Sequence, residues 1–134
     1  MLLYNTFLIS ILKLFIGGSI YYSLEIIARG RSHWSMFLLG GLCFLVCGLI
    51  NSRFGNDISL PAKMTLCMIA ITILELLTGI IVNGFFGWQI WDYSGMPLQI
   101  FGQICVPFML LWFIISYPAL MLNKAIDKLL VFLR

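Results

Sequence analysis

Charged residues are scarce in this sequence. Only 10% of its 134 residues are Asp, Glu, Lys or Arg, whereas 62% are hydrophobic, and the mean hydropathy is +1.07. A soluble domain carries roughly 25% charged residues, and a soluble core of this length leaves a large part of the chain's surface in water. The scarcity of charge therefore excludes a soluble globular domain and indicates an integral membrane protein.

Several catalytic and ligand-binding motifs are also missing. The sequence has no G-x-x-x-x-G-K-[ST] phosphate loop, so the chain is not itself an ATPase. It has a single histidine, no H-E-x-x-H zinc motif and no G-x-S-x-G serine motif, so we expect no catalytic residue, no metal and no cofactor. The four cysteines form no CxxC pair and are expected to serve packing, and no basic patch indicates nucleic-acid binding.

What the sequence does contain is four long apolar runs, at about residues 3–28, 34–50, 64–86 and 98–122. About 20 apolar residues cross a hydrocarbon core about 30 Å thick, and a helix lets each run satisfy its own backbone polar groups. The sequence therefore predicts an all-α, polytopic membrane protein in which residues 1–134 form one compact bundle of four transmembrane helices.

The basic residues predict how this bundle is oriented. Four spans place both termini and the middle loop on one side, where Lys13 is also expected to extend. The basic residues on that side are Arg53, Lys63, Lys124, Lys128 and Arg134. Because the other side holds only Arg29 and Arg31, we expect a multi-pass protein of the cell membrane with both termini in the cytoplasm. The tail after span four is either a short amphipathic helix on the membrane surface or an extension of that span.

Two carboxylates interrupt the apolar runs. Glu25 lies near the far end of the first run, with Tyr21 and Arg29 one helical turn away, and Glu75 lies within the third run. A charge at the bilayer centre costs about 2.5–3.5 kcal/mol on insertion scales, so such residues usually face the bundle interior. A rise of about 1.5 Å per residue places both carboxylates at a similar depth in the outer half of the membrane.

The loop before the fourth run adds a third carboxylate. In "GFFGWQIWDYSGMP" an Asp stands between two aromatic rings, and the following Pro97 fits the first position of a helix that Asp92 or Ser94 would cap. Two glutamines one turn apart are then expected in the outer part of span four. All these polar residues predict one pocket that opens to the outer side. Its candidate ligand-binding residues are Tyr21, Glu25, Arg29, Glu75, Trp91, Asp92, Tyr93, Gln99 and Gln103.

Three segments of the chain resemble a known family. They are "YYSLEIIARG", "ELLTGIIVN" and "WDYSGMPLQIFGQI". Through them the chain is similar to small membrane proteins known as CmpB-type ABC-transporter permeases, and to the animal proteins called transmembrane protein 229, from about Gly18 to Trp112. The resemblance implies a four-span fold in which Glu25, Glu75 and the Asp92 loop are shared features. A permease of this kind would need a separate ATPase subunit and, with four spans, self-association.

Three functional hypotheses stay open. The first, which we favour, is a transport-related or binding protein whose outer pocket holds a small polar or cationic solute or a lipid headgroup, with aromatic rings as a cation-π wall. The second is a structural, accessory or lysis-type membrane protein without a ligand. The third is a membrane enzyme that acts on a lipid-linked substrate, with the carboxylates as acid and base.

Overall fold

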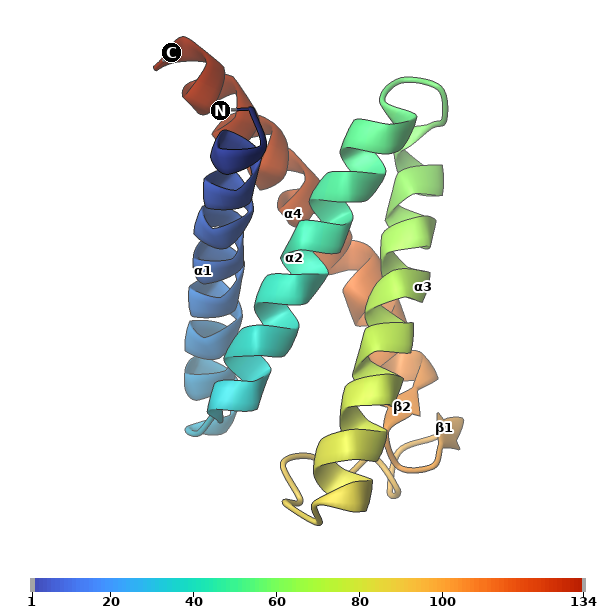
Figure 1. Ribbon diagram of the computed structural model, residues 1–134. Coiled ribbons are helices and arrows are strands. Elements are labelled where there is room, and N and C mark those ends of the chain that lie inside the picture. Colours follow the sequence, from blue (N-terminus) through green and yellow to red (C-terminus); the bar gives the residue numbers. More distant parts are fainter. Residues whose placement is uncertain (1, 134) are drawn as a thin grey trace.

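Long helices make up most of the computed structural model, which describes residues 2–133 (Figure 1). Within these residues there are four long helices: α1 (Leu2–Arg29), α2 (Trp34–Phe54), α3 (Leu60–Gly79) and α4 (Val106–Phe132). A π-helical turn, η1 (Ile80–Phe85), continues α3, and two short strands, β1 (Gln99–Ile100) and β2 (Ile104–Cys105), precede α4. Each of the four helical segments is long and apolar enough to cross a membrane, so the predicted bundle of four membrane-spanning helices is confirmed.

The connections divide between the two ends of the bundle. Figure 1 shows both chain ends and the turn between α2 and α3 at one end, and the α1–α2 turn and the loop before α4 at the other. We call the second end the loop end. Along the bundle α1 packs against α2, and α3 packs against α4, while α2 also contacts both α3 and α4. The predicted cytoplasmic location of the termini stays a prediction, and Arg134, on which it partly relied, lies outside the described residues.

Glycines allow α1 and α2 to pack closely. A Cβ atom on Gly18 would lie 2.6 Å from the carbonyl oxygen of Phe37, and one on Gly41 would lie 2.6 Å from the carbonyl oxygen of Leu14. Real Cβ atoms do not approach other atoms this closely, so only glycine fits at either position. Small residues at such crossings let two backbones approach in a lipid environment, where van der Waals packing replaces the hydrophobic effect as the force between helices.

The buried core lies where α2, α3 and α4 meet. Its fully buried members, each with a relative exposure of 8% or less, are Cys47, Cys67, Ile71, Trp112 and Leu120. All four cysteines are free thiols, and three of them are buried. The cysteines therefore contribute to packing, as their small side chains and their spacing on span two indicate.

The fourth helix begins and ends later than the sequence predicts. Span four was expected at about residues 98–122, whereas α4 runs from Val106 to Phe132. Its C-terminal residues continue the same helix, so the second interpretation of the tail, an extension of span four, describes the structure. The other helices differ less from the prediction: α2 continues to Phe54 and α3 begins at Leu60.

A small hairpin replaces the first two turns expected for span four. Strands β1 and β2 pair antiparallel, with Ile100 opposite Ile104. Between them Phe101 and Gly102 both have positive φ angles, of 54° and 68°. Two consecutive positive φ angles are typical of a tight hairpin turn of type I′ and are incompatible with a right-handed helix. The predicted helix start at Pro97 is therefore wrong.

Candidate functional site

A polar pocket of about 680 Å³ lies at the loop end of the bundle, where four separate parts of the chain meet. It is lined by Glu25, Arg29, Arg31, Asn83, Gln89, Trp91, Asp92, Tyr93, Gln103 and Phe108. We call it the outer pocket. Six of the nine residues predicted for the site line it: Glu25, Arg29, Trp91, Asp92, Tyr93 and Gln103. The other three, Tyr21, Glu75 and Gln99, lie outside this lining.

The carboxylate of Glu25 is held by side chains from its own helix. The Tyr21 hydroxyl donates to its Oε1 at 3.1 Å, and Nη1 of Arg29 lies 3.1 Å from its Oε2. The second guanidinium nitrogen of Arg29 donates to the carbonyl oxygen of Ile90 at 2.9 Å. Charge-assisted hydrogen bonds of this kind are stronger than neutral ones. Arg29 therefore balances the charge of Glu25 and also connects α1 to the loop before α4.

Asn83, in η1, organises the wall of the pocket opposite α1. Its Oδ1 accepts hydrogen bonds from the backbone N–H groups of Ile90, at 2.7 Å, and Trp91, at 3.4 Å. Its Nδ2 donates to Oε1 of Gln103 at 2.9 Å. Asn83 was not among the residues that the sequence predicted for the site. Its position in an apolar run, eight residues after Glu75, was the available signal for its structural role.

Asp92 stabilises its own loop. Its Oδ1 accepts a hydrogen bond from the backbone N–H of Ser94 at 2.9 Å, and this bond holds the pKa of Asp92 below its ordinary value. The side chain is otherwise exposed at the pocket rim, where it stays ionised. Cys105 precedes the first residue of α4 and forms no side-chain cap. The predicted capping of span four by Asp92 or Ser94 is therefore wrong.

The two aromatic rings beside Asp92 have different environments. Trp91 is only 5% exposed, packs against Met36 and Leu39 of α2, and donates from Nε1 to the carbonyl oxygen of Gln103 at 3.0 Å. The ring of Tyr93 stacks on Phe108 of α4, with centroids 4.7 Å apart and an interplanar angle of 13°. Both rings line the outer pocket, and Trp91 also anchors the loop in the core.

The two glutamines expected in span four lie in the hairpin instead. Oε1 of Gln99 accepts a hydrogen bond from the N–H of Gly102 at 2.7 Å, so Gln99 supports the hairpin and does not line the outer pocket. Gln103 follows the turn and bonds to Asn83, as described above. Their predicted placement one turn apart on a helix is wrong, because the backbone at positions 99–105 is extended and turned.

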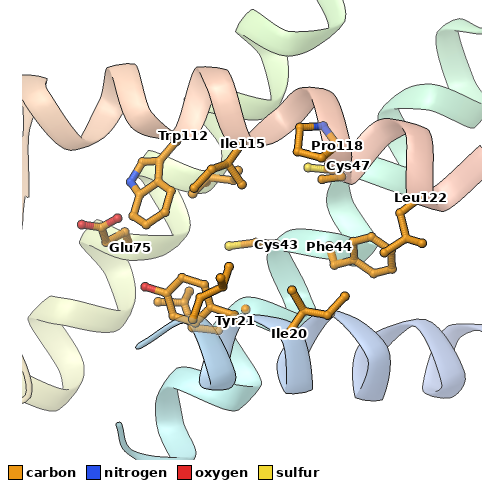
Figure 2. A pocket seen from close by; sticks show the side chains of 16 residues that line it. Ile20, Tyr21, Cys43, Phe44, Cys47, Glu75, Trp112, Ile115, Pro118 and Leu122 are labelled. Atoms are coloured by element: carbon orange, nitrogen blue, oxygen red, sulfur yellow. The ribbon is translucent and has the colours of Figure 1, made fainter. Parts of the chain in front are cut away.

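Glu75 lies in a second cavity, of about 400 Å³, between the four long helices (Figure 2). We call it the inner cavity. Glu75 is the only Asp, Glu, Lys, Arg or His among its lining residues, most of which are apolar. The side chain is 4% exposed, and its Oε1 has no hydrogen-bond partner among the described residues. Tyr93 and Trp112 are the hydrogen-bonding side chains that face this carboxyl group. The single predicted pocket is thus two cavities.

A row of aromatic rings runs from the lining of the outer pocket to the lining of the inner cavity. Tyr93 stacks on Phe108, the Phe108 and Trp112 centroids lie 6.0 Å apart, and those of Trp112 and Tyr21 lie 6.1 Å apart. Phe108 and Tyr93 line the outer pocket, whereas Trp112 and Tyr21 line the inner cavity. Tyr21 lines the inner cavity, but its hydroxyl bonds to Glu25 of the outer pocket. Tyr93 lines the outer pocket, but it faces Glu75 of the inner cavity. The two tyrosines therefore link the two cavities.

The family model described as "Putative ABC-transporter type IV" matches residues 6–133. The chain belongs to this family. Neither a curated protein nor a solved structure matches it. The family resemblance seen in the sequence is therefore confirmed, and the chain is a small multi-pass membrane protein related to ABC transporters. The relation to the animal transmembrane protein 229 family stays a prediction.

The family resemblance implies three shared features: Glu25, Glu75 and the Asp92 loop. In this member of the ABC-transporter family they do not all line the same cavity. Glu25 and the Asp92 loop line the outer pocket, and Glu75 faces the inner cavity. Across residues 2–133, no group of three His, Cys, Asp or Glu side chains is placed to hold a metal ion. Nδ1 of His33, the single histidine, accepts a hydrogen bond from the N–H of Ser35 at 3.2 Å and caps α2.

Proposed function

We propose that the protein is a membrane-embedded binding and transport subunit whose outer pocket takes a small polar solute or lipid headgroup that carries both charges. The observation that supports this most is the gathering of two acidic and two basic side chains around one opening: Glu25, Arg29, Arg31 and Asp92. Ligand sites typically combine a shaped wall with a few convergent polar groups. In this pocket the polar groups are of both signs.

The hydrogen bonds within the pocket indicate which groups remain for a ligand. Glu25 and Arg29 already satisfy each other. Arg31 forms no ion pair among the described residues, and the Asp92 carboxylate, which bonds to Ser94 of its own loop, is exposed at the pocket rim. In this proposal Arg31 binds the anionic end of the ligand, since a guanidinium suits carboxylate and phosphate groups. Asp92 binds the cationic end.

Transport in this proposal requires a second protein. The chain lacks a phosphate loop, so a separate ATPase subunit would supply the energy, and copies of the four-helix chain would associate to form the pathway. We place both termini and the α2–α3 turn in the cytoplasm, where such a subunit would dock. Nζ of Lys63 donates to the carbonyl oxygen of Gly55 at 2.7 Å and to Oδ1 of Asn51 at 3.1 Å, so this turn is internally braced.

The proposal is tested by thermal unfolding of the purified protein in detergent with a panel of zwitterions, such as phosphocholine, phosphoethanolamine and amino acids. A ligand at 100 times its Kd stabilises the folded state by about 2.7 kcal/mol. We expect stabilisation by at least one member, lost in Arg31→Ala and in Asp92→Asn. Arg53→Ala, which changes an exposed arginine at the opposite end, should retain it.

Two results would contradict this function. If no member of the panel stabilises the protein, the outer pocket is a structural feature, and the protein is better described as an accessory subunit without a ligand. The internal pairing of Glu25 with Arg29 is the observation that favours this second candidate. If stabilisation is equal in all three variants, the solutes act on the protein without binding the pocket.

A further inference from the structure

The carboxyl group of Glu75 forms no ion pair with any residue of the part of the chain that the structure describes. Its side chain is 4% exposed, its Oε1 has no partner among the described residues, and no Lys, Arg or His lines the inner cavity. Burying an unpaired charge in an apolar environment is strongly unfavourable. The group must therefore hold a proton or be neutralised by a cation that comes from outside the chain.

The shape and lining of the inner cavity restrict what such a cation can be. Figure 2 shows the rings of Trp112 and Tyr21 beside the Glu75 carboxyl group, with apolar side chains such as Ile115 and Leu122 along the remaining length. A complementary ligand has one positive charge and an apolar surface elsewhere. We propose that the inner cavity binds a lipophilic organic cation, of the quaternary ammonium or phosphonium type, with its charge at Glu75 and against the aromatic rings.

Two other occupants fit this arrangement less well. A hard metal cation needs about six oxygen ligands, whereas the described lining offers one carboxylate and the Tyr21 hydroxyl, which already bonds to Glu25. A neutral acyl chain would fill the apolar length but would leave Oε1 of Glu75 unpaired. A lipophilic cation would pack against the apolar wall and would also neutralise the charge of the Glu75 carboxylate.

Binding of the cation is coupled to release of a proton. A protonated Glu75 gives its proton to water as the cation arrives, and the resulting carboxylate neutralises the bound charge, so that the net charge in the cavity does not change. Binding therefore strengthens as pH rises. The titratable groups that face Glu75 are Tyr21 and Glu25 from α1, Cys43 from α2 and Tyr93 from the loop before α4.

This inference goes beyond the proposed function and does not depend on it, because its charged group and the apolar lining belong to a different cavity.

The test is equilibrium dialysis of labelled tetraphenylphosphonium against the purified protein in detergent, with empty micelles subtracted. We expect one saturable site per chain, a loss of affinity of at least tenfold in Glu75→Gln, and no binding of tetraphenylborate, which has the same shape and the opposite charge. Asp57→Asn, an exposed change in the α2–α3 turn, should bind as the parent does.

A second variant allows the test to be made even if Glu75→Gln fails to fold. Cys43→Leu adds volume to the cavity wall (Figure 2) without changing any charge, and it should weaken binding of the phosphonium ion. Equal binding of tetraphenylborate, or unchanged affinity in both Glu75→Gln and Cys43→Leu, would overturn the inference. Loss in Glu25→Gln with retention in Glu75→Gln would also overturn it, because the cation would then occupy the outer pocket. Arg31→Ala should leave phosphonium binding intact, so the two proposals can fail separately.

Discussion

Nζ of Lys13 lies 2.7 Å from Oδ1 of Asp127 and thereby joins the first and last helices of the bundle. The two side chains differ in exposure, at 11% for Lys13 and 49% for Asp127. The sequence predicted that Lys13 would extend toward the side that carries the termini, and it did not predict a partner there. The partner lies more than a hundred residues away, because the C-terminal part of α4 continues as a helix and crosses near α1 at the end of the bundle that carries the termini (Figure 1).

This ion pair predicts an asymmetric effect of mutation. Asp127→Asn leaves a mostly buried lysine without a counter-charge, and we expect it to lower the free energy of unfolding by about 1 kcal/mol, the upper end for a partly exposed pair. Adding Lys13→Met to that variant should recover most of the loss, since an apolar pair of similar volume avoids the buried charge. Thermal unfolding in detergent measures both. If the double variant is less stable than Asp127→Asn alone, the lysine has a role beyond the pair.

The close approach of α1 and α2 predicts a second effect. Gly41→Ala would place a Cβ atom 2.6 Å from the carbonyl oxygen of Leu14, and backbone cannot move as a side chain can. We expect a loss of about 1–3 kcal/mol, the usual range for overpacking. Gly84→Ala is the matched control, because no atom lies within 4 Å of its added Cβ. Equal unfolding temperatures for the two variants would show that α1 and α2 separate at little cost.

Much of the fold was readable from the sequence because crossing a membrane requires long apolar helices. The four runs predicted the four spans, and the polar residues at the far end predicted a polar pocket there. The start of α4 was not readable, since residues 98–105 are as apolar as a helix would be. What prevents the helix is the backbone conformation, with positive φ at Leu98 and Phe101, and neither residue type favours such angles.

The division of the site between two cavities could not be predicted for a different reason. Residue spacing gives depth along a helix, and it predicted that Glu25 and Glu75 lie at a similar depth. It does not give the direction in which each helix faces its neighbours. The aromatic row that runs along the two cavities includes Phe108 and Trp112, which the sequence offers only as two more apolar residues of span four.

The hydrogen bond from the Ser94 N–H to Asp92 predicts a pH dependence. The bond lowers the pKa of Asp92 in the folded protein, so its contribution to stability is present above the ordinary aspartate pKa and is lost as pH falls through the lowered one. Carboxyl ¹³C NMR of the protein in micelles should give a titration midpoint for Asp92 below that of an unstructured peptide with the same sequence. Ser94→Ala keeps the backbone donor and should keep most of the lowering. A midpoint equal to that of the peptide would show that the loop bond does not form in solution.

The hairpin turn before α4 predicts a stabilising substitution. Phe101 occupies the first central position of a turn with φ of 54°, closed by the N–H of Gln103 bonding to the carbonyl oxygen of Ile100 at 3.0 Å. Asn at this position, followed by Gly102, is the pair that type I′ turns favour. Since a left-handed residue costs roughly 1–2 kcal/mol and the Phe101 side chain is 78% exposed, Phe101→Asn should raise the free energy of unfolding by about 1 kcal/mol.

The control for this substitution is Phe85→Asn. Phe85 is 82% exposed but lies in the helical turn η1, outside the positive-φ region, so the same change relieves no backbone strain there. Thermal unfolding in detergent should give a higher midpoint for Phe101→Asn than for the parent and no increase for Phe85→Asn. Because loss of an exposed ring is common to both variants, a difference between them reports the turn itself. Equal midpoints would mean that the type I′ conformation at Phe101 is not maintained. The placement of Gln103 at the outer pocket, which depends on this turn, would then also be wrong.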